Sequence, residues 1–212
     1  DRDTVNSRID WIGRDTRSEQ PFFGMLWTIQ SHYPYYTWGH VRKFCDDPKL
    51  NRYLTAVAET DYALGELLDW LDKSKLADST LVVVFGDHGE AFGQHGQWGH
   101  GTAIYEENIA IPLMLINPQL FHGETYDARG GTVDMAPTAL EAIGIPSPGQ
   151  WQGRSLIDGD RTGREYFCQP YNGLQFGYRE GKMKVILDAW NNTAEVYDLA
   201  ADRYETKNLA AD

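Results

Sequence analysis

The sequence predicts an α/β fold with a mostly parallel central sheet, and three stretches indicate it. Residues 21–30, PFFGMLWTIQ, are apolar on both faces, as in a strand buried on both sides. Residues 50–71 repeat leucine and valine at spacings of three and four, which is typical of an amphipathic helix. Residues 80–85, TLVVVF, are again apolar on both faces and rich in β-branched side chains. The order strand, helix, strand predicts a right-handed crossover and a parallel pair.

Further elements are expected on either side of this core. Residues 7–19 are polar and predict a helix around SRIDWIGRD. Residues 111–117, IPLMLIN, predict a third buried strand. A helix is expected to begin at Asp134 and to stop at Gly144 and Pro146. Together with the strands, these helices complete an α/β domain over the first 150 residues.

The character of the chain changes after residue 150. Residues 151–212 begin with a stretch rich in Gly, Pro and polar residues, which we interpret as a linker. LQFGYREGKMKVIL and AEVYDL then predict short antiparallel strands, with turns at REGK and WNNT. The sequence therefore predicts a domain over 1–150, followed by a linker and a small subdomain over 151–212.

Composition excludes several classes of function. The formal net charge of −12 argues against a nucleic-acid partner, because binding to phosphates favours a basic face. No apolar run approaches the ~20 residues that a membrane-spanning helix needs. The two cysteines, Cys45 and Cys168, lie far apart in the sequence; they could pair, but nothing requires it. Acidic chains do bind hard cations, so a metal site stays open.

The stretch VVVFGDHGEAFGQHGQWGHG, residues 82–101, carries the clearest chemical signal. It holds three of the six histidines, and it directly follows a predicted strand. Ligands in open α/β sheets bind beyond the carboxyl ends of strands, which is where Asp87 and His88 lie. A carboxylate and an imidazole beside glycines suit a divalent metal. His95 and His100, on the following loop, could bind an anion or protonate a leaving group.

Other polar residues have simpler interpretations. His40 and His122 lack a patterned context and are expected to be ordinary histidines, and Glu90 is interpreted as a possible cap without an assigned role. Asp61 lies within the apolar stripe of the predicted helix, so we expect it to accept hydrogen bonds in the core. The first apolar strand runs out at His32. The aromatic residues after it could line a substrate cleft or pack a loop: Tyr33, Tyr35, Tyr36 and Trp38.

Several longer stretches of the chain resemble a known family. DHGEAFGQHGQWGHGTAIYEENIAIPLML is similar to the C-terminal signature of the sulfatase branch of the alkaline phosphatase superfamily. PFFGMLWTIQSHYPY is similar to the family's strand that ends in a substrate-contacting histidine, and YLTAVAETDYALGELLDWL to its long helix before the metal strand. VDMAPTALEAIGIP, GRSL and EVYDLAADRYETKNLA resemble later segments, in the family's order. The resemblance covers nearly the whole chain from about Pro21 onward, and the motifs are jointly specific.

The resemblance implies a fold and a set of roles. The fold would be an alkaline phosphatase-like α/β sandwich, with 1–150 as the C-terminal portion of the catalytic domain and 151–212 as linker and small α+β subdomain. A divalent metal binds the family positions that correspond to Asp87 and His88. His100 matches a position that contacts the transferred group or the leaving oxygen. His32 matches a position that holds the anion, and His95 matches a less constant substrate-binding position.

Two departures from the family pattern affect the expected activity. The family nucleophile is a Cys or Ser in a C/S-x-P-x-R stretch, converted to formylglycine, or a Thr in phosphotransferases. These residues contain no such stretch, because CDDPK at Cys45 has the wrong spacing and no arginine; the first-strand acids of the metal site are also absent. Many sulfatases have a lysine at the position of His100, whereas related membrane-anchored hydrolases and phosphotransferases have a histidine.

The resemblance thus implies part of a metal-dependent hydrolase of sulfate esters, carried on small molecules or glycans, with the fragment alone inactive. One alternative is a phosphotransferase or phosphodiesterase of the same superfamily that acts on envelope lipid or polymer head groups. Another is a non-catalytic binding module that retains the fold. Calcium is the expected metal, as in sulfatases, with manganese, zinc or magnesium as alternatives, because imidazole suits transition metals better than calcium.

Overall fold

The computed structural model describes residues 1–15, 20–126, 128–157, 163–171 and 173–210. These residues form two compact units, Asp1–Thr80 and Leu81–Asp212. Each unit is described by itself below. Among the described residues, no helix is both long enough and apolar enough to cross a bilayer. Cys45 and Cys168 are both free thiols.

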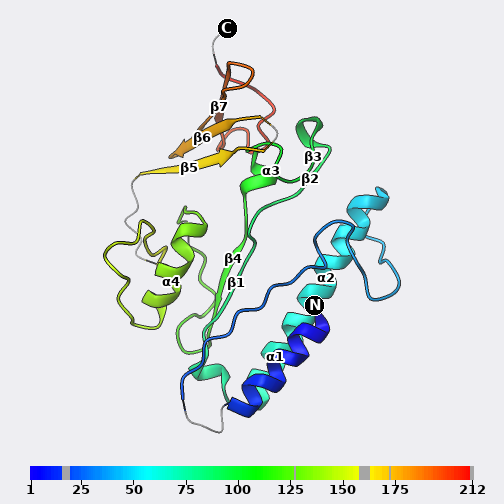
Figure 1. The fold of residues 1–212 in the computed structure, drawn as a ribbon, viewed down its shortest axis with the longest axis vertical. Coiled ribbons are helices and arrows are strands. Elements are labelled where there is room, and N and C mark those ends of the chain that lie inside the picture. The colour runs from blue at the N-terminus through cyan, green and yellow to red at the C-terminus, as the bar shows by residue number, and fades with distance from the viewer. Residues whose placement is uncertain (16–19, 127, 158–162, 172, 211–212) are drawn as a thin grey trace. The chain divides into compact units, whose positions relative to one another are not determined.

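Two helices build the first unit: α1 (Arg2–Asp15) and α2 (Pro48–Lys73). They lie side by side and run in the same direction, with Arg2 bonded to Glu66 near the start of α1 (Figure 1). α2 begins at a proline, which lacks the N–H that the first helical turn leaves unpaired. The predicted helix over 50–71 is therefore confirmed and extends by about one turn.

The buried face of α2 coincides with the predicted leucine stripe only at Leu71. It follows a spacing of four residues through Thr55, Glu59, Ala63 and Leu67, and Asp61 is exposed. The expectation that Asp61 lies in the core is therefore wrong. Glu59 is the buried acid instead, and its Oε2 atom accepts hydrogen bonds from the Gln30 side chain and the Trp38 backbone, both at 2.8 Å. These two hydrogen bonds replace those that the carboxylate would make with water. Side-chain periodicity alone does not reveal such partners.

The predicted strand over 21–30 and its parallel pairing are not confirmed. The segment is described in full and has no assigned strand. It passes along α1, where the Trp11 and Phe22 rings meet edge to face at 6.1 Å. Every second side chain from Phe23 onward faces solvent: Phe23 is 87% exposed, Met25 66%, Trp27 74% and Ile29 66%. The alternation of these four large side chains is that of a strand, but no strand among the described residues pairs with the segment.

The second unit begins with a short two-stranded sheet. β1 (Val82–Phe85) pairs antiparallel with β4 (Leu113–Ile116), so that both strands predicted here exist. Between them lie the hairpin β2 (Ala91–Phe92) and β3 (Trp98–Gly99), and the single-turn helix α3 (Glu106–Ile109).

The helix α4 (Met135–Ala142) follows a 3₁₀ turn over Thr132–Asp134. The buried Asp134 carboxylate accepts hydrogen bonds from the backbone N–H groups of Gly131, at 2.9 Å, and Arg154, at 2.8 Å. Gly144 ends this region with a φ of 75°, which glycine adopts without a Cβ clash. The predicted helix and its stop at Gly144 are therefore confirmed.

The C-terminal part of the second unit is a four-stranded antiparallel sheet. Its strands occur in chain order: β5 (Arg164–Gln169), β6 (Gln175–Glu180), β7 (Met183–Asp188) and β8 (Thr193–Asp198). The antiparallel strands predicted from residue 174 onward are confirmed, and β5 was not predicted. Ile104, Ile186, Tyr197 and Leu199 form a buried cluster behind one face. A Cβ on Gly177 would lie 2.8 Å from the Val185 carbonyl oxygen, a backbone atom, and 2.7 Å from the Ile104 side chain, so glycine is favoured there.

Candidate active-site loop and metal centre

The candidate site is built on the loop that follows β1. Asp87 and His88 lie two and three residues beyond the end of the strand, as predicted. Gly89 then holds the loop against α3, since its N–H donates to the Asn108 carbonyl at 2.8 Å. A Cβ at Gly89 would lie 2.2 Å from the Glu107 carbonyl oxygen. Only glycine allows so close an approach to the α3 backbone. This contact fixes the position of the loop at Asp87 and His88.

Asp87 and His88 present adjacent oxygen and nitrogen donors. The Asp87 Oδ1 atom accepts the His88 backbone N–H at 3.0 Å, and Asp87 Oδ2 lies 3.7 Å from His88 Nε2. Two metal–ligand bonds of ~2.0–2.2 Å span ~4 Å, so one cation can contact both atoms. The side chains are 63% and 40% exposed, respectively, and are therefore accessible to a cation. The pair fits a divalent metal.

His100 and Glu90 lie beside this pair. The His88 and His100 rings stack with centroids 4.2 Å apart, and His100 Nδ1 lies 2.7 Å from Glu90 Oε2. Donor atoms of His88, Glu90 and His100 all lie within 4.8 Å of one another. The structure therefore brings together the two predicted residues His88 and His100. Glu90, to which the sequence assigned no role, lies beside them.

His95 faces away from this group toward the C-terminal part of the unit. Its Nδ1 atom lies 2.8 Å from Glu107 Oε1, and its Nε2 atom lies 2.9 Å from the Glu205 carbonyl oxygen. Both partners only accept hydrogen bonds, so both ring nitrogens must carry protons. Burial lowers the pKa of His95, but the bonds to Glu107 and Glu205 outweigh it and raise the pKa overall. The cationic ring stacks on Tyr105 at 3.8 Å.

A buried ionic network continues from His95 into the sheet. Lys184, on β7, is fully buried; its Nζ atom lies 2.8 Å from Glu205 Oε1 and 3.0 Å from Glu106 Oε1. The Glu205 carboxylate also accepts the Glu106 backbone N–H at 2.6 Å. Burial raises the pKa of Glu205, while the Lys184 ion pair acts in the opposite direction. The network ties the end of the chain to the segment that follows the site loop.

His32 belongs to the first unit, where it lies in the turn after the extended segment. It is exposed, and its Nδ1 atom donates to the Tyr33 carbonyl oxygen at 2.8 Å. The aromatic residues after it have mixed roles: Tyr35 is buried, whereas Tyr36 and Trp38 are 67% and 43% exposed.

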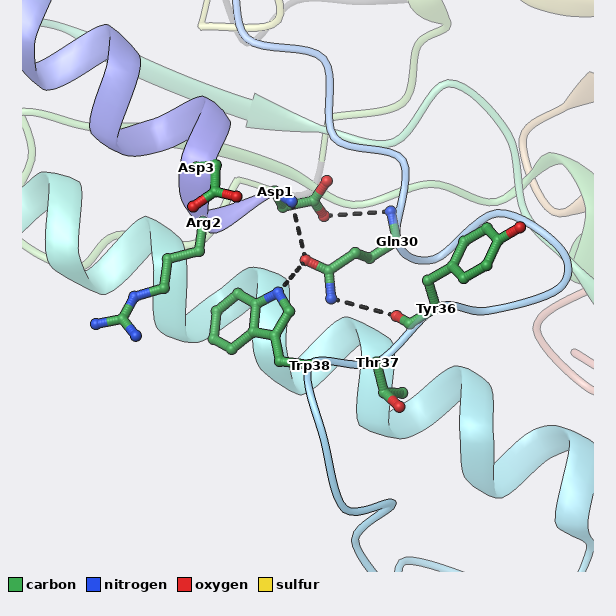
Figure 2. Close-up of a pocket in the computed structure, with 7 residues that line it drawn as sticks. All are labelled: Asp1, Arg2, Asp3, Gln30, Tyr36, Thr37 and Trp38. Carbon is green, nitrogen blue, oxygen red and sulfur yellow. Dashed lines mark hydrogen bonds between the residues drawn. The ribbon is translucent and has the colours of Figure 1, made fainter.

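Tyr36 and Trp38 contribute to a pocket of about 310 Å³ in the first unit (Figure 2). Gln30 lies between them: its Oε1 atom accepts from Trp38 Nε1 at 2.7 Å, and its Nε2 atom donates to the Tyr36 carbonyl oxygen at 3.2 Å. The remaining lining residues are Asp1, Arg2 and Asp3, at the start of α1, and Thr37, between Tyr36 and Trp38. Tyr36 and Trp38 therefore line a pocket and Tyr35 packs in the interior, and the substrate cleft stays a prediction.

Comparison with known proteins shows that the chain is similar to sulfatases. A family model described as Sulfatase matches residues 1–145. The chain is 32% identical over 201 residues to the low-salt glycan biosynthesis sulfotransferase Agl7 of Haloferax volcanii, covering 87% of this chain and 49% of Agl7. It is 31% identical over 178 residues to an N-acetylglucosamine-6-O-sulfatase of Bacteroides thetaiotaomicron, covering 74% of this chain and 31% of that protein. The chain thus spans half or less of these relatives.

Solved structures give the same picture. BT4656 in complex with its substrate D-glucosamine-2-N,6-O-disulfate matches with a TM-score of 0.67 and 27% identity, over 77% of this chain and 38% of that one. The yidJ protein of Bacteroides fragilis matches with a TM-score of 0.75 and 20% identity, over 98% of this chain and 53% of that one. At that identity the second likeness shows the fold alone.

Proposed function

Because the chain belongs to the sulfatase family and has the alkaline phosphatase-like fold of its structural neighbours, we propose that it forms part of a metal-dependent hydrolase of sulfate esters. The observation that carries the proposal is the group of donors after β1: Asp87 and His88 side by side, with His100 stacked on His88. An acid, two imidazoles and open access are what binding of an anionic ester beside a cation requires.

Asp87 and His88 would hold the divalent metal through a carboxylate oxygen and an imidazole nitrogen. When bound, the cation supplies charge neutralisation at the sulfate oxygens and helps to activate the nucleophile. Calcium remains the proposed metal, and the imidazole ligand keeps manganese, zinc and magnesium as alternatives. The exposed carboxylate of Asp87 supports this assignment, because it has room for a cation.

His100 and His32 would act on the ester itself. His100 would donate a proton or a hydrogen bond to the leaving oxygen, which develops negative charge as the S–O bond breaks. His32 would hold a non-bridging oxygen of the sulfate. His95 was expected to bind substrate as well, but its two nitrogens are engaged by Glu107 and the Glu205 carbonyl. We therefore propose that His95 supports the loop rather than the ester.

The proposed substrate is a sulfated sugar. The named substrate of BT4656 is a disulfated glucosamine, and the Bacteroides thetaiotaomicron relative is named for a 6-O-sulfated N-acetylglucosamine. Agl7 is named as a sulfotransferase of glycan biosynthesis, so the acceptor of the sulfuryl group could be water or a sugar hydroxyl. These names all pair a sulfuryl group with a sugar, which favours sulfate over phosphate esters.

The test of this proposal uses chromogenic sulfate and phosphate esters with added calcium, manganese or zinc. The 212 residues contain no C/S-x-P-x-R stretch, so we expect no turnover from them alone. A longer protein that joins them to a nucleophile-bearing half should hydrolyse the sulfate ester in preference to the phosphate ester. Sustained turnover by the 212-residue chain would contradict the expectation that these residues lack the nucleophile. Metal binding without turnover in the longer protein would favour the non-catalytic binding module.

A further inference from the structure

We propose that Glu90 is a positioning residue that fixes the orientation and the tautomer of the His100 ring. The consequence for the leaving oxygen rests on the proposed function, whereas the tautomer itself does not. The sequence assigned no role to Glu90, and the pairing follows from contacts within the second unit.

The contact between the two side chains is short and protected. Glu90 Oε2 lies 2.7 Å from His100 Nδ1, and the Glu90 side chain is only 7% exposed, against 32% for His100. A carboxylate offers only acceptors, so the proton between the two atoms must lie on Nδ1. In a neutral ring with Nδ1 protonated, Nε2 carries the lone pair. In the cation, Nε2–H is the second donor.

The backbone register explains why these residues meet. In the hairpin of β2 and β3, Ala91 lies opposite Gly99 and Phe92 lies opposite Trp98. Extension of that register by one residue places Glu90 opposite His100. Directly opposed residues of an antiparallel pair project to the same side, with Cβ atoms ~4.5–5.5 Å apart. The contact is therefore a property of the hairpin and not of a freely rotating loop.

The bond also limits how His100 can meet a cation. The proximity of His88, Glu90 and His100 would be compatible with a single cation held by all three. A proton shared between Glu90 and Nδ1 of His100 removes that nitrogen and that oxygen from such a cation. Only Nε2 of His100 then remains for a ligand, and under the proposed function that ligand is the leaving oxygen. Carboxylates that bond to functional histidines orient rings in this way.

The test is a long-range ¹H–¹⁵N correlation spectrum of the metal-free 212-residue chain with ¹⁵N-labelled histidine. The spectrum is recorded at about pH 9, where an ordinary histidine with a pKa of ~6.5 is neutral. A His100→Gln variant identifies the His100 signals. We expect Nδ1 of His100 to give the shift of a protonated nitrogen and Nε2 that of an unprotonated one. In Glu90→Ala and Glu90→Met, the proton should move to Nε2, the tautomer that imidazole side chains favour in water.

A matched control is available at His95. Glu107→Gln breaks a carboxylate–imidazole contact of nearly the same length, 2.8 Å, and should leave the His100 signals unchanged. Circular dichroism selects the variants that retain the wild-type fold, and either Glu90 variant suffices. An unprotonated Nδ1 in the wild type, or one that stays protonated in both Glu90 variants, would overturn the proposal. So would loss of the Nδ1 proton when equimolar Zn²⁺ is added, because Nδ1 would then bind the metal instead of the Glu90 carboxylate. None of these outcomes depends on turnover.

Discussion

The ammonium nitrogen of Lys184 lies 2.8 Å from Glu205 Oε1, and neither side chain is exposed to solvent. The pair joins β7 to the segment after β8, and Glu106 on α3 completes it at 3.0 Å. Because burial removes both charges from water, each charge depends on the other for compensation. The C-terminal segment is therefore attached by charge as well as by the apolar cluster around Ile186.

Replacement of Lys184 by methionine should destabilise the chain strongly. The variant leaves the Glu205 carboxylate buried without its cation, which costs about 3–5 kcal/mol. Chemical denaturation followed by circular dichroism measures the loss. Lys182→Met is the matched control, because its ion pair with Asp198 is also 2.8 Å long but the lysine is 63% exposed. That exposed pair should contribute at most about 1 kcal/mol, and equal losses in the two variants would contradict the assigned role of burial.

Stability should depend on pH through His95. Its folded-state pKa is raised, chiefly because Glu107 and the Glu205 carbonyl overcome the opposing effect of burial. A raised histidine pKa stabilises the fold fully below its unfolded value of ~6.5, and this contribution is lost as pH rises through the folded value. The urea midpoint should therefore fall over that range in the wild type. In His95→Gln this component of the slope should be missing, and an unchanged slope would show that His95 is not the titrating group.

Gly89→Ala should disrupt the start of the site loop. The added methyl group would lie 2.2 Å from the Glu107 carbonyl oxygen, and this backbone atom cannot move aside alone. Overpacking of this kind costs about 1–3 kcal/mol. Gly65→Ala, in the interior of α2 with open space around it, should instead stabilise by up to about 1 kcal/mol. Thermal unfolding of both variants tests whether the steric contact, rather than the loss of glycine itself, decides if the substitution stabilises or destabilises the chain.

Asp87→Ala should weaken metal binding by the chain. The variant removes the carboxylate that lies 3.7 Å from His88 Nε2, so a cation would keep only the imidazole of the pair. Isothermal titration with calcium, manganese and zinc measures the change. Asp46→Ala, at a fully exposed carboxylate of the first unit, is the control and should bind like the wild type. Equal metal affinity of the two variants would exclude Asp87 as a ligand.

Much of the secondary structure was predictable because its causes are local. The α2 helix has a proline start and a dense apolar pattern, and the antiparallel strands after residue 174 are separated by turn sequences. The two-sided apolar pattern of residues 21–30 was equally clear, yet these residues do not form a strand. A strand needs a neighbouring strand to pair with, and the side-chain pattern of one segment does not reveal whether such a neighbour is present. The burial of Glu59 in place of Asp61 has the same origin, since its partners Gln30 and Trp38 lie far away in sequence.

The candidate site divides in a similar way. Asp87 and His88 were found from their place at the end of a strand, which sequence can indicate. Glu90 was missed, although its offset from His100 follows from the hairpin between them once the register Ala91 to Gly99 is known. The two-residue strands of this hairpin are too short to give a periodic signal. The contact of His95 with the Glu205 carbonyl joins residues 110 positions apart, and no local pattern predicts it.

The exposed ribbon of Phe23, Met25, Trp27 and Ile29 should favour self-association of the chain in concentrated solution. Residues 20–41 contain no Asp, Glu, Lys or Arg, so the net charge of −12 is carried elsewhere and does not protect this stretch. An extended, uncharged segment with exposed aromatic and aliphatic side chains is a template for pairing with another molecule. Two chains that meet through these ribbons would face no charge repulsion within residues 20–41. Solubility, more than unfolding, would then limit the concentration at which the isolated chain can be handled.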